Sequence, residues 1–187
     1  MKENSTKRTE FEENLKEHLS EIPEKFDRDY RIAAVVVPII WGNEPELLLT
    51  RRAYTLESFR GQIAFPGGRP EPGEGPLETA LREFEEEVGI SRDNLHVLGA
   101  LRVEKTRLSD FMIYPVVGVL ESGIKFKKNP DEVAEIFTVK IPDLPTCEKY
   151  HPLIWSIFQC GDYTIWGATF RIIKKLLGVF DEAKIPY

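Results

Sequence analysis

The stretch from Gly68 to Ile90 constrains the fold most, because a loop rich in glycine and proline runs directly into a regular acidic segment. Pro76 suits the first turn of a helix, and Gly89 suits the left-handed residue that ends one. At about 100° per residue, the apolar side chains of this segment share one side of the helix. These side chains are Leu77, Ala80, Leu81, Phe84 and Val88. The segment therefore predicts a helix that packs against a core.

The same helix concentrates negative charge away from its apolar side. Glu83, Glu86 and Glu87 cluster about a third of a turn from the apolar residues. Carboxylates three and four residues apart repel each other by a few tenths of a kcal/mol per pair, so a compensating charge is expected. Arg82 offsets part of this charge, and hard oxygen ligands suit Mg²⁺ or Mn²⁺. Taken alone, an acidic run more often means only a solvated surface.

The loop before the helix favours the metal site over the solvated surface. It is too rich in glycine and proline for a strand or helix, and it brings Glu74 to the N-terminal side of the helix. The loop and the helix together resemble the complete Nudix box. The matching positions are Gly68, Glu74, Arg82-Glu83-Phe84, Glu86-Glu87 and Gly89-Ile90, each at the expected spacing.

The resemblance to the Nudix family implies an α/β fold, a Nudix-type α/β/α sandwich with a mixed central sheet. It implies that Glu83, Glu86 and Glu87 are catalytic and, with the Gly68 carbonyl, bind the metal. Glu74 and Arg82 would brace these ligands from behind. The resemblance also implies hydrolysis of a diphosphate linkage. This reaction would depend on divalent metals, because a diphosphate facing several carboxylates is bound only when metals neutralise both sides.

The segment Leu48–Phe65, before the box, bears on the substrate. It is similar to the sequence that precedes the box in coenzyme A diphosphatases, a Nudix subfamily. That similarity implies cleavage of coenzyme A or acyl-coenzyme A to 3′,5′-ADP and (acyl-)4′-phosphopantetheine. Glu57 departs from the pattern, which has an arginine there, and Arg60 is the candidate to replace it. The matching positions are Leu48, Leu49, Thr50, Arg52, Ala53, Gly61, Gln62, Phe65, Pro66, Gly67 and Gly68.

Two other functions are open from the sequence. The box fits equally well a diphosphatase that acts on ADP-ribose, nucleotide sugars or another nucleoside diphosphate derivative. A non-catalytic nucleotide-sensing regulator is the third possibility, although the intact carboxylates at Glu83, Glu86 and Glu87 argue against it.

Four arginines are predicted to bind the substrate: Arg51, Arg52, Arg60 and Arg69. Guanidinium groups match phosphate oxygens, and this local concentration is unusual in an acidic protein. The alternative is that some of them pair with acidic residues of the same loop and only hold its shape.

Outside the box, Glu132 is the candidate for a catalytic base or an additional metal ligand, with Glu135 behind it. The expectation follows from the Nudix resemblance, since a loop carboxylate takes either role in such enzymes. A surface turn with solvated acids is the alternative.

The remaining sequence predicts one domain and its surroundings. Residues 26–187 are expected to form a single Nudix domain, preceded by an N-terminal helical extension, 1–25. The extension has a predicted helix from Thr9 to about Leu19. This helix is expected to pack on the domain or on a partner subunit, and in the second case the protein would be a homodimer. Strands from Ile32 to Ile40 and from Glu46 to Arg52 predict a hairpin. Further strands are expected from Leu95 to Glu104 and from Ile136 to Ile141.

Charge and hydropathy exclude several classes of partner. A net charge of −6 and a pI near 5.3 argue against a nucleic-acid binder, which needs a basic surface. No apolar run approaches the roughly 18 residues of a membrane span, and the N-terminus lacks the apolar core of a signal peptide. A cytoplasmic location is therefore expected, with a small nucleoside diphosphate derivative as the partner.

Overall fold

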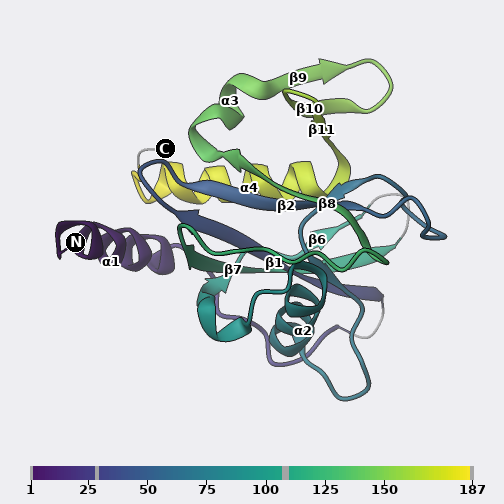
Figure 1. The fold of residues 1–187 in the computed structure, drawn as a ribbon, viewed down its shortest axis with the longest axis horizontal. Helices are drawn as coiled ribbons and strands as arrows, with labels where there is room; N and C mark the ends of the chain where they lie inside the picture. The colour runs from purple at the N-terminus through teal and green to yellow at the C-terminus, as the bar shows by residue number, and fades with distance from the viewer. Residues whose placement is uncertain (1, 28–29, 107–109, 186–187) are drawn as a thin grey trace.

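In the computed structural model, which describes residues 2–27, 30–106 and 110–185, one mixed sheet lies between two helices. Helix α2 (Pro76–Val88) covers one face, and helix α4 (Gly167–Glu182) covers the other (Figure 1). The sheet separates two buried apolar clusters, one packed against each helix. The α/β/α sandwich with a mixed central sheet is confirmed.

Strand β1 (Arg31–Trp41) is the centre of the sheet. It runs parallel to β7 (Phe111–Glu121) and antiparallel to β2 (Glu46–Arg52), so the predicted hairpin is confirmed. β2 pairs on its other side with β8 (Val133–Lys140), and β7 pairs with β5 (His96–Ala100). Three short strands complete the sheet: β3 (Ile63–Ala64), β4 (Gly67–Gly68) and β6 (Glu104–Lys105).

Alternation along β1 explains why this strand is buried on both faces. Ala34 and Val36 point toward α2, and Val35 and Val37 point toward α4, as the two-residue period of a strand requires. A continuous apolar run is the pattern of such a central strand. The same alternation sends neighbouring residues of β2 to opposite faces, which matters for its two arginines.

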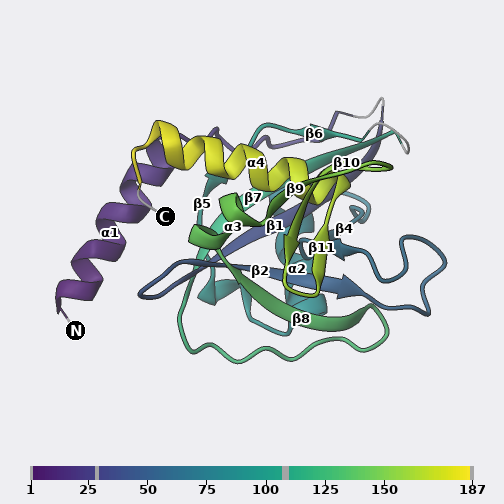
Figure 2. The same cartoon turned by 90° about the horizontal axis from the view of Figure 1, so that it is seen from above.

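Helix α1 (Lys2–Glu17) packs on this domain. Phe11 and Leu15 are buried in the cluster beneath α4, and the Phe11 ring lies 4.7 Å from that of Trp41 and 5.9 Å from that of Phe180. The first half of α1 extends away from the sheet (Figure 2). The sequence left open whether this helix packs on the domain or on a partner subunit, and in the structure it packs on the domain.

Several strand predictions needed correction. The strand expected from Leu95 to Glu104 is divided into β5 and β6, because its pairing with β7 is irregular: Ala100 lies opposite Val116 and Glu104 opposite Ile113, so one strand advances four positions where the other advances three. β8 begins three residues earlier than expected, since its pairing with β2 extends to Val133. A second sheet was not anticipated. It follows α3 (Leu144–Cys147), lies on the α4 side (Figure 1), and consists of β9 (Glu148–His151), β10 (Trp155–Cys160) and β11 (Tyr163–Ile165).

Two short 3₁₀ helices, Arg92–Asn94 and Ile141–Asp143, follow α2 and β8. Cys147 and Cys160 are half-buried free thiols. Within the described ranges, no helix has the length and apolar character needed to cross a membrane.

Candidate metal centre

Local sequence sets the ends and the rotation of α2. Gly75 precedes the helix, and its backbone N–H donates to the Glu78 carboxylate at 3.1 Å. Gly89 ends the helix in the left-handed conformation, with φ 67°. Phe84 is fully buried against the sheet, and this contact fixes which residues face the loop that carries Gly68.

Three carboxylates converge beside the N-terminal end of the box. Glu83, Glu87 and Glu132 each offer an oxygen, and these oxygens lie within 4.8 Å of one another. Glu83 and Glu87 are one helical turn apart, whereas Glu132 comes from the loop before β8. That loop is held by the Ala53 N–H, which donates to the Glu132 carbonyl at 2.8 Å, and by Asn129, whose side chain donates to the Glu132 carboxylate at 3.3 Å.

The electrostatics of this group call for a cation. Glu87 is 2% exposed, and burial raises its pKa to about 8. Arg52 opposes the rise, while the charges of Glu83 and Glu132 add to it. Burial also raises the pKa of Glu83. Three crowded oxygen ligands of this kind fit a hard divalent cation, which would neutralise them.

Two glycines let the backbone approach the carboxylates. The Gly67 N–H donates to Glu87 at 3.3 Å, and a side chain at Gly67 would meet the Ala34 carbonyl at 2.3 Å. A Cβ at Gly68 would lie 2.4 Å from the carboxyl carbon of Glu83. The backbone of Gly68 thus lies directly beside a carboxylate of the group, and its role as a metal ligand stays a prediction from the resemblance.

Arg82 and Glu74 hold Glu83 from behind. The Arg82 guanidinium donates to both oxygens of Glu74, at 2.7 and 3.0 Å, and to Glu83 at 3.0 Å. Thr79 also donates to Glu74, at 3.0 Å. The hydrogen bond from Arg82 lowers the pKa of Glu74 to about 2 and raises that of Arg82. These are the contacts through which Glu74 and Arg82 would brace the metal ligands, and that role stays a prediction.

A Glu74→Gln variant should therefore show a pH-dependent loss of stability. Because the pKa of Glu74 is depressed in the folded state, its contribution is fully present above pH 4.5 and is lost as the pH falls toward 2. We expect the variant to unfold at lower denaturant concentration than wild type at pH 7 and the two curves to converge near pH 2. Urea unfolding at both pH values measures this, and a constant gap across the range would contradict it.

Glu86 differs from the other acidic residues of the box. It lies outside the group of three carboxylates, its side chain is 48% exposed, and it accepts a hydrogen bond from Arg82 at 3.1 Å. Its role as a metal ligand stays a prediction from the resemblance.

The four predicted substrate arginines are dispersed. Arg52 faces α2, with Nη1 3.9 Å from the Glu87 carboxylate, and its buried Nε has no hydrogen-bond partner among the described residues. Arg51 points to the opposite face and donates to Glu135 at 3.1 Å. Arg60 and Arg69 are exposed in loops. Of the four, Arg52 alone has a guanidinium recorded beside the described carboxylate group.

One contact of Arg51 had no signal in the sequence. Tyr163, from the unanticipated second sheet, donates its hydroxyl to Glu135 at 2.8 Å, and Arg51 lies 5.5 Å above its ring. The Tyr163 ring stacks on Phe137 with centroids 3.7 Å apart. Glu135 is thus engaged on the α4 face and is separated by the sheet from Glu132.

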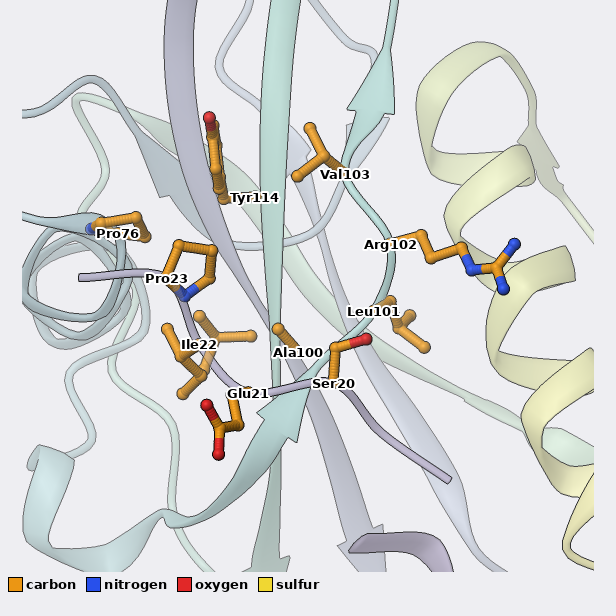
Figure 3. A pocket seen from close by; sticks show the side chains of 11 residues that line it. Ser20, Glu21, Ile22, Pro23, Pro76, Ala100, Leu101, Arg102, Val103 and Tyr114 are labelled. Carbon is orange, nitrogen blue, oxygen red and sulfur yellow. The ribbon is translucent and has the colours of Figure 1, made fainter. Parts of the chain in front are cut away.

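A small apolar cavity of about 160 Å³ lies beside Pro76, at the start of α2. The segment 20–23 and the loop 100–103 enclose it, and Tyr114 and Pro76 also line it (Figure 3). Its lining includes none of the three converging carboxylates, so the cavity and the candidate metal centre are separate features.

Comparison with known proteins agrees with this geometry. Residues 29–158 match the model of the NUDIX domain. A protein of Photorhabdus laumondii named as an uncharacterized Nudix hydrolase, NudL, is 39% identical over 164 residues, which cover 82% of this chain and 87% of that relative.

Solved structures show the same fold at low sequence identity. The Nudix hydrolase RenU of M. smegmatis has a TM-score of 0.58 at 18% identity, covering 84% of this chain and 89% of that one. A MutT protein of Methanosarcina mazei has a TM-score of 0.57 at 20% identity, covering 84% and 96%. With the matched domain, the related sequence and the carboxylates of α2, the chain belongs to the Nudix family, as a hydrolase that acts on pyrophosphate bonds.

Proposed function

We propose that this Nudix hydrolase cleaves the diphosphate linkage of coenzyme A or acyl-coenzyme A in a reaction that depends on Mg²⁺ or Mn²⁺. The observation that carries the proposal is the convergence of Glu83, Glu87 and Glu132 opposite Arg52. The choice of coenzyme A rests on the similarity of the segment Leu48–Phe65 to coenzyme A diphosphatases. Nudix enzymes generally use divalent metal ions, and the choice between Mg²⁺ and Mn²⁺ is part of the proposal.

We assign three roles in diphosphate hydrolysis: metal binding, phosphate binding and proton transfer. Glu83 and Glu87, with the Gly68 carbonyl, would hold the metal, which when bound neutralises the diphosphate and acidifies water. Arg52 would donate to phosphate oxygens, because its guanidinium points at the site and its buried Nε is unpartnered among the described residues. Glu132 would either accept a proton from water or complete the ligand set.

The other proposed contacts concern substrate position. Arg60 and Arg69 are exposed and free to reach phosphate groups outside the metal site. Arg51 would act from the opposite face of the sheet, where its pairing with Glu135 leaves part of the fork available. A homodimer and a cytoplasmic location stay predictions from the sequence.

A substrate panel tests the proposal. Coenzyme A, ADP-ribose, NADH, a nucleotide sugar and a dinucleoside polyphosphate are assayed with Mg²⁺ and with Mn²⁺. We expect the highest kcat/KM for coenzyme A, no turnover in EDTA, and 3′,5′-ADP as a product. A far higher kcat/KM for ADP-ribose would replace coenzyme A by another nucleoside diphosphate derivative. No turnover of any compound would favour the nucleotide-sensing regulator.

A further inference from the structure

Two guanidinium groups contact the same aromatic ring at the beginning of β1 and β7. The Cζ of Arg31 lies 4.7 Å from the ring centroid of Phe111, and that of Arg69 lies 5.3 Å from it. Both arginines are exposed. Within residues 30–106 and 110–185, no carboxylate is recorded within 4.0 Å of either guanidinium, and Asp110, next to Phe111, pairs with neither.

This arrangement is unusual for an acidic protein. Of the other arginines that the structure describes, Arg60 and Arg102 also have no carboxylate recorded within 4.0 Å. The rest form ion pairs with carboxylates: Arg8, Arg51, Arg52, Arg82, Arg92 and Arg171. Two like charges beside one ring repel each other, and the ring face offsets only part of that cost. Two adjacent guanidinium groups suit an anion with several oxygens, such as phosphate.

The pair lies next to the candidate metal centre but faces the other way. Arg69 directly follows Gly68, and its carbonyl accepts a hydrogen bond from Arg82 at 2.9 Å. Gly68 pairs with Ala34 in the sheet, and Arg31 pairs with Phe111. By strand alternation, Arg31, Phe111 and Arg69 belong to the α4 face, whereas Gly68 faces Glu83 on the α2 face.

A third cation lies at the same end of the sheet. The Lys105 Nζ is 4.2 Å from the ring centroid of Tyr30, which precedes Arg31. Lys105 pairs with Met112, the residue after Phe111. Glu104, the neighbour of Lys105, is neutralised by Arg171 and by Lys175, so Arg31, Arg69 and Lys105 outnumber the neighbouring Asp110 at this end of the sheet.

We propose that Arg31 and Arg69, whose guanidinium groups both contact the Phe111 ring, form an anion subsite for a phosphate group on the ribose of the substrate. The inference rests on the proposed function, because the scissile diphosphate must occupy the metal centre on the α2 face. The guanidinium groups lie at the beginning of β1 and β7 and not on the α2 face, so they would meet a phosphate other than the scissile diphosphate. In a nucleoside diphosphate derivative, a ribose hydroxyl is the nearest position for it. The enzyme therefore selects ribose-phosphorylated nucleotides over ADP-ribose and nucleotide sugars, which lack that group.

The test compares coenzyme A with dephospho-coenzyme A, which differ by one ribose phosphate. In wild type, kcat/KM should be about tenfold higher for coenzyme A. Arg31→Met should bring the ratio close to one, and Arg31→Lys, which keeps the charge, should restore part of it. Lys16→Met removes an exposed charge from α1 and should leave the ratio at the wild-type value. An unchanged ratio in Arg31→Met would overturn the subsite.

A binding measurement keeps this inference separate from turnover. Calorimetry with 3′,5′-ADP and with AMP should give about tenfold tighter binding of the bisphosphate to wild type, and Arg31→Met should abolish the difference. Equal affinities in wild type would overturn the subsite even if coenzyme A is cleaved. A preserved difference without any turnover would support the subsite and refute the proposed function.

Discussion

A Glu87→Gln variant should lose at least about a hundredfold in kcat and yet, without metal at pH 8, be more stable than the wild-type protein. Glu87 is buried and its pKa is raised to about 8, so the folded state holds its proton more tightly than the unfolded chain does. The stability from this group is therefore complete below pH 4.5 and is lost as the pH rises toward 8. The loss is on the order of 3 kcal/mol. Glutamine removes the charge and still accepts from the Gly67 N–H.

Denaturant unfolding in EDTA at pH 5 and pH 8 measures the change in stability, and assays in Mg²⁺ or Mn²⁺ measure the change in kcat. The stability advantage of Glu87→Gln should appear at pH 8 and be small at pH 5. Glu86→Gln is the matched comparison from the same helix: we expect a loss of at least about tenfold in kcat without a gain in stability, because Glu86 is half exposed. Wild-type kcat in Glu87→Gln would remove this residue from the metal centre.

A Gly68→Ala variant should lose about a hundredfold in kcat/KM, because the added methyl group displaces the carboxylate of Glu83. The new Cβ would lie 2.4 Å from the carboxyl carbon of Glu83 and 2.4 Å from its Oε1, so Glu83 must move. Arg82 holds Glu83 at 3.0 Å, and the displacement breaks that hydrogen bond as well. A misplaced ligand weakens metal binding and the alignment of the reacting groups. Metal titrations should show a higher apparent Kd.

Gly178→Ala is the control for the added methyl group. Gly178 lies within α4, and a Cβ there meets no atom within 4 Å. This variant should keep wild-type activity and gain about 0.5–1 kcal/mol in stability, because alanine is the better residue within a helix. Wild-type kcat/KM and metal affinity in Gly68→Ala would contradict the prediction, because they would mean that a Cβ at this position does not displace Glu83.

The box helix could be predicted closely because its determinants are local. Pro76 and Gly89 set its ends, and the apolar spacing sets its buried face. The contacts of Glu74 with Arg82 follow from the same short stretch, since the two residues are eight positions apart along loop and helix. Each of these features depends on residues that are neighbours along the chain.

Features that depend on long-range pairing were less accessible. The division of the Leu95–Glu104 strand into β5 and β6 follows from the irregular register of this segment against β7, which no local sequence pattern indicates. The second sheet consists of short strands without clear alternation. Arg51 and Arg52 looked equivalent in the sequence, whereas strand alternation directs one to Glu135 and the other toward Glu87.

The sequence by itself determined the family, the box helix and the kind of bond that is cleaved, because those depend on residue types at fixed short spacings. Only the tertiary structure decided which charged groups meet. It brought Glu132 to Glu83 and Glu87 across more than forty positions and left Glu86 outside that group. It also paired Arg31 with Arg69 around Phe111. The physical reason is that distances between side chains on different strands are set by sheet register and packing, which a spacing along the chain does not contain.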